Sequence, residues 1–251
     1  MISTNHPVFP EMAQKLTEEE EDYDNNSSLL PDSNGPPVFK ILPKWVSKAS
    51  YYFDKEHYCY AGHNIIIQES IECFGAVVWP AALALCQYLE SNQEEIDLKG
   101  KKVLEIGAGT GLVSIVASIL GAFVTATDLP EVLVNLEFNI TRNIQNLDVH
   151  KPEVRKLIWG TNLPEDFPKE THHYDFIVAT DVVYHHTALD SLLDTLRYLC
   201  QPGTTLVWAN KFRFSTDYEF LDSMSNLFNI TQLAEFPESS IKLFKGIIKE
   251  N

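Results

Sequence analysis

Three glycines and one acidic residue stand at spacings that suit the binding of a nucleoside. Gly107, Gly109 and Gly111 follow a short apolar segment, and Asp128 comes 21 residues after the first glycine. Because glycine has no Cβ, backbone amides in such a turn can approach a ligand at the start of a helix. An acid at the end of the next strand can accept hydrogen bonds from both hydroxyls of a ribose. Sites for NAD and for S-adenosylmethionine share all of these features.

The residues around the first glycine distinguish between these two cofactors. The glycines follow the pattern G-x-G-x-G instead of G-x-G-x-x-G, and Glu105 stands two residues before Gly107. A carboxylate at that place would repel a pyrophosphate, whereas S-adenosylmethionine has no phosphate and carries a cationic amine and a sulfonium. We therefore predict that Glu105 and Asp128 belong to a site for S-adenosylmethionine. The alternative is a glycine turn that only packs a strand against a helix.

Alternating strands and helices surround this turn and predict an α/β protein with a mostly parallel sheet. Short apolar segments predict strands at 103–106, 123–127, 154–158, 174–180 and 205–209. Periodic apolar residues predict helices at 76–89, 112–120, 131–143, 189–199 and 218–228. Four residues join the last two predicted strands, 230–236 and 241–249, which is too short for a parallel crossover, so these strands must pair antiparallel. The pattern predicts a Rossmann-like class I methyltransferase fold, with seven strands and a C-terminal antiparallel hairpin.

The composition changes near residue 37 and divides the chain into two parts. Residues 1–37 combine an acidic and polar run with a cluster of proline and glycine, and they lack periodic apolar residues. They predict a disordered acidic extension. Residues 38–251 predict one methyltransferase domain that begins with a β-hairpin within 38–70. The expected hairpin strands are 50–53 and 65–68, with residues 61–64 between them.

Charge and cysteine content limit the classes of partner and location. The formal net charge of −16 disfavours general affinity for nucleic acid, and no apolar run reaches the length of a membrane span. The four cysteines form no C-x-x-C pair, and the N-terminus shows no signal pattern, so we expect a cytoplasmic or nuclear protein with reduced thiols. The adjacent pairs at 172–173 and 185–186 are histidines whose side chains diverge on a strand or a helix, so we expect no metal site.

Five short motifs together resemble those of the seven-strand protein-lysine methyltransferases. They are WPAA at 79–82, EIGAGTG at 105–111, TDLP at 127–130, WG at 159–160 and DVVY at 181–184. The likeness covers residues 38–251 and is greatest to the branch that modifies heat-shock chaperones and the valosin-containing ATPase. The glycine motif alone would indicate a methyltransferase of any kind, whereas its combination with WPAA and DVVY is more specific.

The resemblance implies which residues complete the cofactor site. Trp79 borders the cofactor, Trp159 flanks its adenine and Asp128 binds its ribose. The amino-acid end of the cofactor lies at the glycine turn, on Gly107, Ala108 and Gly109. Thr180, immediately before DVVY, touches the cofactor as well, although many relatives have alanine or serine there.

The DVVY segment supplies the two residues that we predict to act on the substrate amine. Asp181 can accept hydrogen bonds from an ammonium and orient it, and Tyr184 can offer a hydroxyl and an aromatic wall. The alternative for Asp181 is a cap on the helix that follows it. Enzymes that methylate base amines or glutamine amides usually have an N-P-P-Y turn, and both prolines are absent here. This difference favours an aliphatic amine as the target.

The predicted function is transfer of methyl from S-adenosyl-L-methionine to a lysine of a protein, with a chaperone-like ATPase as the substrate. Two alternatives remain from the sequence: a methyltransferase for a small molecule, and a cofactor-binding module that docks a partner without catalysis. We expect a monomer that binds no nucleic acid and no membrane. Fold alone does not decide between these functions.

Overall fold

A computed structural model describes residues 55–70, 76–184 and 186–249 of the chain. The predicted acidic extension at 1–37 and the predicted strand at 50–53 lie outside the described residues. Among the helices that are described, none is long and apolar enough to cross a membrane.

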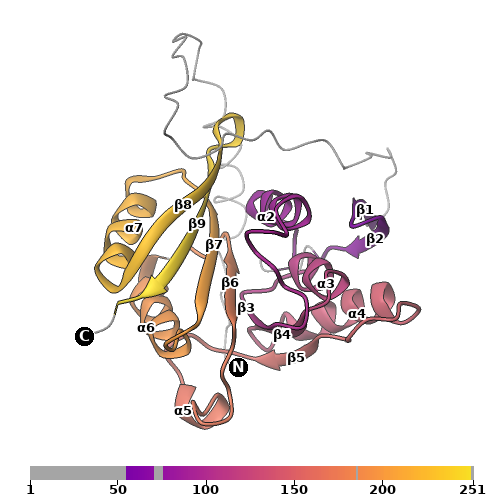
Figure 1. The fold of residues 1–251 in the computed structure, drawn as a ribbon, viewed down its shortest axis with the longest axis horizontal. Coiled ribbons are helices and arrows are strands. Elements are labelled where there is room, and N and C mark those ends of the chain that lie inside the picture. The colour runs from indigo at the N-terminus through magenta and orange to yellow at the C-terminus, as the bar shows by residue number, and fades with distance from the viewer. Residues whose placement is uncertain (1–54, 71–75, 185, 250–251) are drawn as a thin grey trace, which may run out of the picture. The chain divides into compact units, whose positions relative to one another are not determined.

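A seven-stranded sheet forms the centre of the described domain (Figure 1). Its strands are β3 (Lys102–Ile106), β4 (Phe123–Asp128), β5 (Glu153–Lys156), β6 (Phe176–Thr180), β7 (Thr205–Lys211), β8 (Phe228–Phe236) and β9 (Ile241–Ile248). Their spatial order is β5-β4-β3-β6-β7-β9-β8. The first five strands are parallel, while β9 pairs antiparallel with both β7 and β8. The predicted architecture, including the antiparallel hairpin at the C-terminus, is therefore confirmed.

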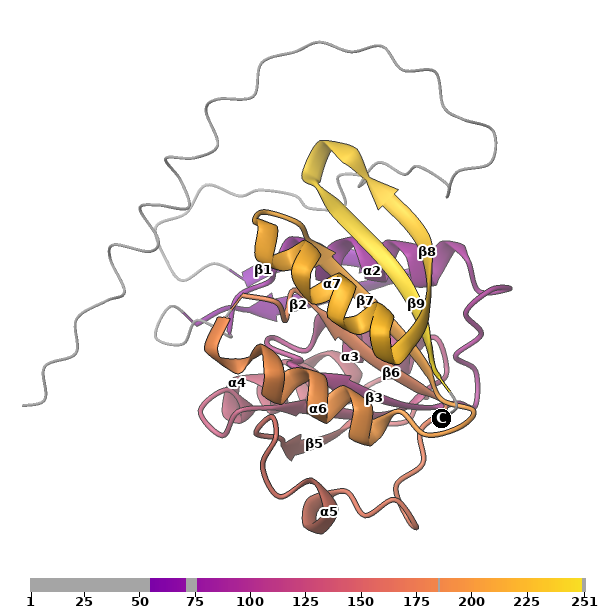
Figure 2. The same ribbon diagram turned by 90° about the vertical axis from the view of Figure 1, so that its left-hand side faces the viewer.

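Helices cover both faces of this sheet, as Figures 1 and 2 show from two sides. One face carries α2 (Pro80–Ser91), α3 (Leu112–Ile119) and α4 (Leu133–Ile144), and the other carries α6 (Leu189–Leu199) and α7 (Ser215–Leu227). Two short elements that the sequence analysis did not predict are α5 (Leu163–Asp166) and the 3-10 turn η1 (His186–Ala188). A second such turn, η2 (Pro237–Ser239), joins β8 to β9. Each sheet face is thus buried under amphipathic helices, which is the arrangement that parallel strands require.

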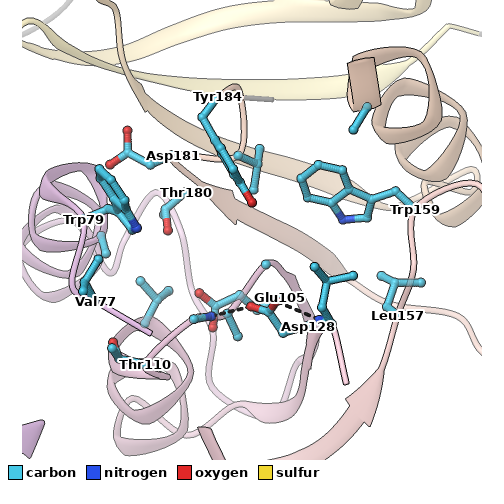
Figure 3. A pocket seen from close by; sticks show the side chains of 18 of the residues that line it. Val77, Trp79, Glu105, Thr110, Asp128, Leu157, Trp159, Thr180, Asp181 and Tyr184 are labelled. Carbon is cyan, nitrogen blue, oxygen red and sulfur yellow. Dashed lines mark hydrogen bonds between the residues drawn. The ribbon is translucent and has the colours of Figure 1, made fainter. Parts of the chain in front are cut away.

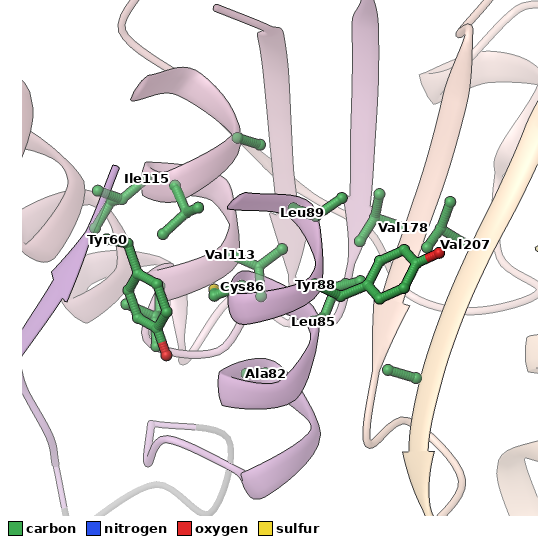
Figure 4. Close-up of a cluster of buried hydrophobic side chains, with 14 of the residues drawn as sticks. Tyr60, Ala82, Leu85, Cys86, Tyr88, Leu89, Val113, Ile115, Val178 and Val207 are labelled. Atoms are coloured by element: carbon green, nitrogen blue, oxygen red, sulfur yellow. The ribbon is translucent and has the colours of Figure 1, made fainter. Parts of the chain in front are cut away.

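The helix α2 lies in the middle of one hydrophobic core (Figure 4). Leu85 and Leu89 are fully buried along its length, and Val113 of α3 packs in the same cluster. Val178 and Val207, on neighbouring strands, close the cluster from the side of the sheet. Because α2 is packed on several sides, Trp79, which directly precedes this helix, has a well-defined position.

A separate two-stranded hairpin precedes α2 in the chain. It consists of β1 (Lys55–Tyr60) and β2 (His63–Gln68), which pair antiparallel. Ala61 and Gly62 form the turn, both with positive φ, as a two-residue hairpin turn requires. The described first strand therefore lies closer to the turn than the predicted one, and β2 begins two residues earlier than predicted.

Candidate functional site

One cavity of about 340 Å³ opens at the carboxyl ends of the parallel strands (Figure 3). Parallel strands deliver their following loops to the same edge of a sheet, which is where ligands bind in such folds. All ten residues that the sequence analysis assigned to a site line this cavity: Trp79, Glu105, Gly107, Ala108, Gly109, Asp128, Trp159, Thr180, Asp181 and Tyr184. The structure therefore brings together residues from five motifs that span more than a hundred positions of the chain.

The glycine turn and Asp128 are joined directly by a hydrogen bond. Oδ2 of Asp128 accepts from the backbone amide of Gly109 at 2.7 Å, and Oδ1 accepts from the amide of Leu129 at 2.7 Å. Gly107 and Gly109 both have positive φ, which a side chain would disfavour. The carboxylate therefore has a fixed orientation beside the turn, at the end of β4 where a ribose would be bound.

Glu105 and Asp128, two of the three acids that line the cavity, have raised pKa values. Burial is the main cause of the rise of the Glu105 pKa to about 8, the nearby charge of Asp128 adds to it, and a hydrogen bond donated by the Ser114 hydroxyl opposes it. Burial likewise raises the pKa of Asp128 to about 6, against the two amide bonds that favour its ionised form. A ligand with positive charge would offset this desolvation cost, whereas a phosphate would add to it.

Apolar side chains form the wall at the end of β5. Trp159 lines the cavity together with Leu157 and Ile158, which the sequence analysis did not assign to the site. A Cβ on Gly107 would stand 3.9 Å from the Trp159 ring and 3.1 Å from a methyl group of Val182. The absence of a side chain at Gly107 thus lets the cavity continue between the turn and the indole. Such a slot suits a planar ring such as adenine.

The carboxylate of Asp181 already has backbone partners. Oδ2 accepts from the amide of Ala81 at 2.7 Å, and Oδ1 accepts from the amide of Lys211 at 2.9 Å. The guanidinium of Arg213 lies 3.7 Å from Oδ1, and the Asp181 side chain is 1% exposed. Burial raises the Asp181 pKa, while the two amides and the Arg213 charge oppose the rise. Asp181 therefore caps a helix, as the alternative prediction had it. The helix that it caps is α2, about 100 residues earlier in the chain, and not the helix that follows Asp181.

This contact joins the WPAA and DVVY motifs in space. Trp79 is the N-cap residue of α2 and provides no side-chain cap of its own. Asp181 supplies the missing acceptor at this helix start, while its own backbone has the left-handed φ of 49° that few residues other than glycine adopt. The guanidinium of Arg213 also lies 5.9 Å from the centre of the Trp79 ring. Asp181 and Arg213 therefore fix the position of Trp79 at the cavity.

Tyr184 and Thr180 lie on the side of the cavity opposite the glycine turn. In Figure 3 the ring of Tyr184 stands between Thr180 and Trp159, with its hydroxyl pointing into the cavity. Tyr184 is 47% exposed, so its ring is accessible from solvent. An incoming side chain could pass this ring before it reached the centre of the cavity.

Several further residues line the cavity that the sequence analysis did not assign. They are Val77, Val78, Ala82, Thr110, Leu112, Val113, Leu129, Leu157, Ile158, Val182, Thr187, Ala188 and Ser191. Most of them adjoin a recognised motif, so position next to that motif was the available signal. Thr187, Ala188 and Ser191 carry no such signal, because they enter through η1 and the start of α6. Within the described ranges, no group of three or more His, Cys, Asp or Glu side chains could hold a metal ion.

Comparisons with known proteins give the family and the fold of this chain. Residues 61–227 match the family described as lysine methyltransferase. The chain is 40% identical to the protein-lysine methyltransferase METTL21E of Mus musculus, over 99% of this chain and 97% of that protein. It is 35% identical to the EEF1A lysine methyltransferase 3 of Xenopus tropicalis, over 82% of this chain and 92% of that protein. Among solved structures, the T. Thermophilus 16S rRNA N2 G1207 methyltransferase RsmC, in complex with AdoMet and guanosine, has a TM-score of 0.55 at 14% identity. That match covers 78% of this chain and half of RsmC, and at this identity it shows the fold alone.

Proposed function

This chain belongs to the lysine methyltransferase family, and we propose that its cavity binds S-adenosylmethionine for transfer of methyl to a lysine of a chaperone-like ATPase. The observation that carries this proposal is the single cavity lined by all five motifs. The coarser activity, methylation of protein lysine, follows from the family. The substrate protein rests on the resemblance to the branch that modifies chaperones and the valosin-containing ATPase.

The chemistry of the cavity suits S-adenosylmethionine part by part. Asp128 offers carboxylate oxygens to ribose hydroxyls, and Trp159 offers an aromatic face to adenine. The turn around Ala108 and the buried Glu105 suit the cationic amino-acid end. When bound, this cofactor supplies a methyl group on an activated sulfonium.

The protein then needs to receive, orient and shield the lysine amine. The exposed ring of Tyr184 can contact the approaching ammonium, and its hydroxyl points to where the amine must arrive. A lysine amine must lose its proton before it can act as a nucleophile. Trp79, which directly precedes the helix start that Asp181 caps, also lines the cavity. Holding the two reactants close and in line lowers the barrier to such a transfer.

The pH dependence of cofactor affinity tests the electrostatic part of this proposal. A cationic ligand binds better when Glu105 and Asp128 are ionised, and their raised pKa values are about 8 and about 6. The affinity for S-adenosylmethionine should therefore rise from about pH 6 to about pH 8. S-adenosylhomocysteine lacks the sulfonium charge and should show a smaller rise. Equal pH profiles for the two compounds would contradict this account of the two acids.

Labelling of a cell lysate tests the activity itself. The purified protein is incubated with methyl-labelled S-adenosylmethionine, and labelled bands are mapped by mass spectrometry. We expect label on lysine of a protein, with a large loss in the Tyr184→Phe variant. Tyr218→Phe is the matched control, because Tyr218 is similarly exposed, at 49%, and does not line the cavity. Label that appears in small metabolites instead would replace the protein substrate with a small molecule.

A purified chaperone and a purified valosin-containing ATPase test the finer substrate assignment. Each is added separately to the labelling reaction, beside an unrelated protein of similar lysine content. Methylation of one ATPase at a single lysine supports the assignment, and labelling of a different lysate protein overturns it. We also propose a cytoplasmic or nuclear location, since Cys59, Cys86 and Cys200 are free thiols.

A further inference from the structure

Two asparagines of α4 bind the outer edge of the hairpin strand β2. The side chain of Asn143 pairs with Ile66, accepting from its amide at 2.8 Å and donating to its carbonyl at 2.9 Å. The side chain of Asn139 pairs in the same way with Gln68, at 2.9 Å and 3.0 Å. Each carboxamide thus satisfies both backbone groups of one residue, as a neighbouring strand would do.

The spacing of these residues matches helix geometry to strand geometry. Asn139 and Asn143 are four residues apart, which separates them by about 6 Å along a helix. Ile66 and Gln68 are two residues apart, which separates them by about 6.6 Å along a strand. The sequence N-x-x-x-N on α4 can therefore act as a side-chain substitute for one more strand. It also covers an otherwise open sheet edge.

Asn139 makes one further contact that reaches the cavity. Its Nδ2 atom donates to the carbonyl of Thr110 at 3.1 Å, in addition to the carbonyl of Gln68. Asn139 is completely buried, so Thr110 would lose this donor if the side chain were removed. Thr110 stands between the last two glycines of the turn and lines the cavity. The second donor of Asn143 instead goes to the carbonyl of Asn139, inside α4.

The same helix also packs directly against the turn. A Cβ placed on Gly111 would stand 2.7 Å from a methyl group of Leu136 and 3.2 Å from Ile140, both on α4. Close packing at Gly111 and the hydrogen bond at Thr110 therefore fix the turn from two adjacent positions. The amide of the preceding Gly109 is bonded to Asp128. The turn is thus held between α4 on one side and β4 on the other.

We propose that Asn139 is a positioning residue that holds the glycine turn in its cofactor-binding shape and couples it to docking of the hairpin. This inference rests on the proposed binding of S-adenosylmethionine. Gln68 and Thr110 share one carboxamide, so movement of the hairpin edge disturbs a carbonyl of the turn. By reciprocity, a ligand that orders the turn stabilises the docked hairpin.

A pair of alanine variants tests this role. Asn139→Ala and Asn143→Ala each remove three side-chain hydrogen bonds and one of the two attachments of β2 to α4, but the first alone frees the carbonyl of Thr110. Calorimetry should show that affinity for S-adenosylmethionine falls roughly tenfold in Asn139→Ala, which corresponds to about 1.4 kcal/mol. It should change by less than about twofold in Asn143→Ala. Hydrogen exchange should become faster at the amide of Gln68 in Asn139→Ala and at the amide of Ile66 in Asn143→Ala.

The outcomes separate this inference from the proposed function. Wild-type affinity in a folded Asn139→Ala variant, or an equal loss in both variants, overturns the coupling alone. Absence of cofactor binding by the wild-type protein overturns the proposed function and the coupling with it.

A measurement on the wild-type protein does not depend on how well the variants fold. Saturation with S-adenosylhomocysteine should slow hydrogen exchange at the amide of Gln68. The amides of β8, the edge strand at the opposite end of the sheet from β5, are the control and should not change. Protection that appears at Gly109 without any change at Gln68 would overturn the coupling.

Discussion

Replacing Asp181 with alanine removes a buried carboxylate that accepts hydrogen bonds from two elements. The amides of Ala81 and Lys211 lose their acceptor, and the start of α2 loses its cap. Each hydrogen bond to a charged group contributes roughly 1.5–3 kcal/mol. The desolvation cost of the carboxylate, visible in its raised pKa, offsets part of this sum. We therefore expect the free energy of unfolding to fall by about 2–4 kcal/mol.

Urea denaturation at neutral pH without cofactor measures this change. Affinity for S-adenosylmethionine, measured by calorimetry on the folded variant, should fall roughly tenfold because Trp79 is no longer fixed. Asp217→Ala is the matched control: Asp217 is equally buried and accepts from the amides of Arg213 and Phe214, but it does not line the cavity. It should lose similar stability while the affinity for the cofactor falls less than in Asp181→Ala, because the start of α2 keeps its cap.

The result that would refute this reasoning is specific. If Asp181→Ala unfolded at the wild-type urea concentration and bound cofactor normally, yet lost turnover more than about a hundredfold, the carboxylate would act on the substrate amine. The original prediction of an amine-orienting role for Asp181 would then be supported. The capping contacts with Ala81 and Lys211 would contribute little to stability.

Three further substitutions, one of them with a matched control, have expected outcomes. Burial keeps the carboxyl of Glu105 protonated in the folded protein to about pH 8, while the unfolded chain ionises near 4.5, so the free energy of unfolding should fall across this range. In Glu105→Gln the free energy of unfolding should fall less with rising pH. Urea denaturation at several pH values measures this, and an equal pH dependence in the variant and the wild-type protein would contradict the prediction. Gly111→Ala should cost about 2–4 kcal/mol, because it combines a φ of 86° with a clash against Leu136. Gly203→Ala, with a φ of 89° and open space around it, should cost only about 1 kcal/mol, so similar losses of thermal stability would exclude the packing term. Trp159→Ala should weaken binding of S-adenosylmethionine roughly tenfold in calorimetry, because the adenine loses an aromatic face. Unchanged affinity would show that the adenine does not lie against Trp159.

Local patterns in the sequence, together with the family resemblance, were sufficient to predict the fold and the residues that line the cavity. Apolar period and length distinguish strands from helices, and a four-residue link forces the last two strands to pair antiparallel. In a parallel sheet the loops after the strands share one edge, so Gly107, Asp128 and Thr180 had to lie near one another. Element ends were less accurate: α4 begins at Leu133 instead of 131, and the short α5 was not predicted.

Only the tertiary structure decided which groups contact each other across long separations. The order that places β9 between β7 and β8 follows from packing of whole sheet edges, which no local period encodes. The partners of Asp181 lie about 100 and 30 residues away, and their identity depends on where α2 and β7 end in space. The sequence by itself therefore determined which residues gather at the site. The role of the Asp181 carboxylate was different: an acid can bind a substrate amine or cap a helix, and its residue type allows both. Only the hydrogen bonds of the packed structure show that it caps α2.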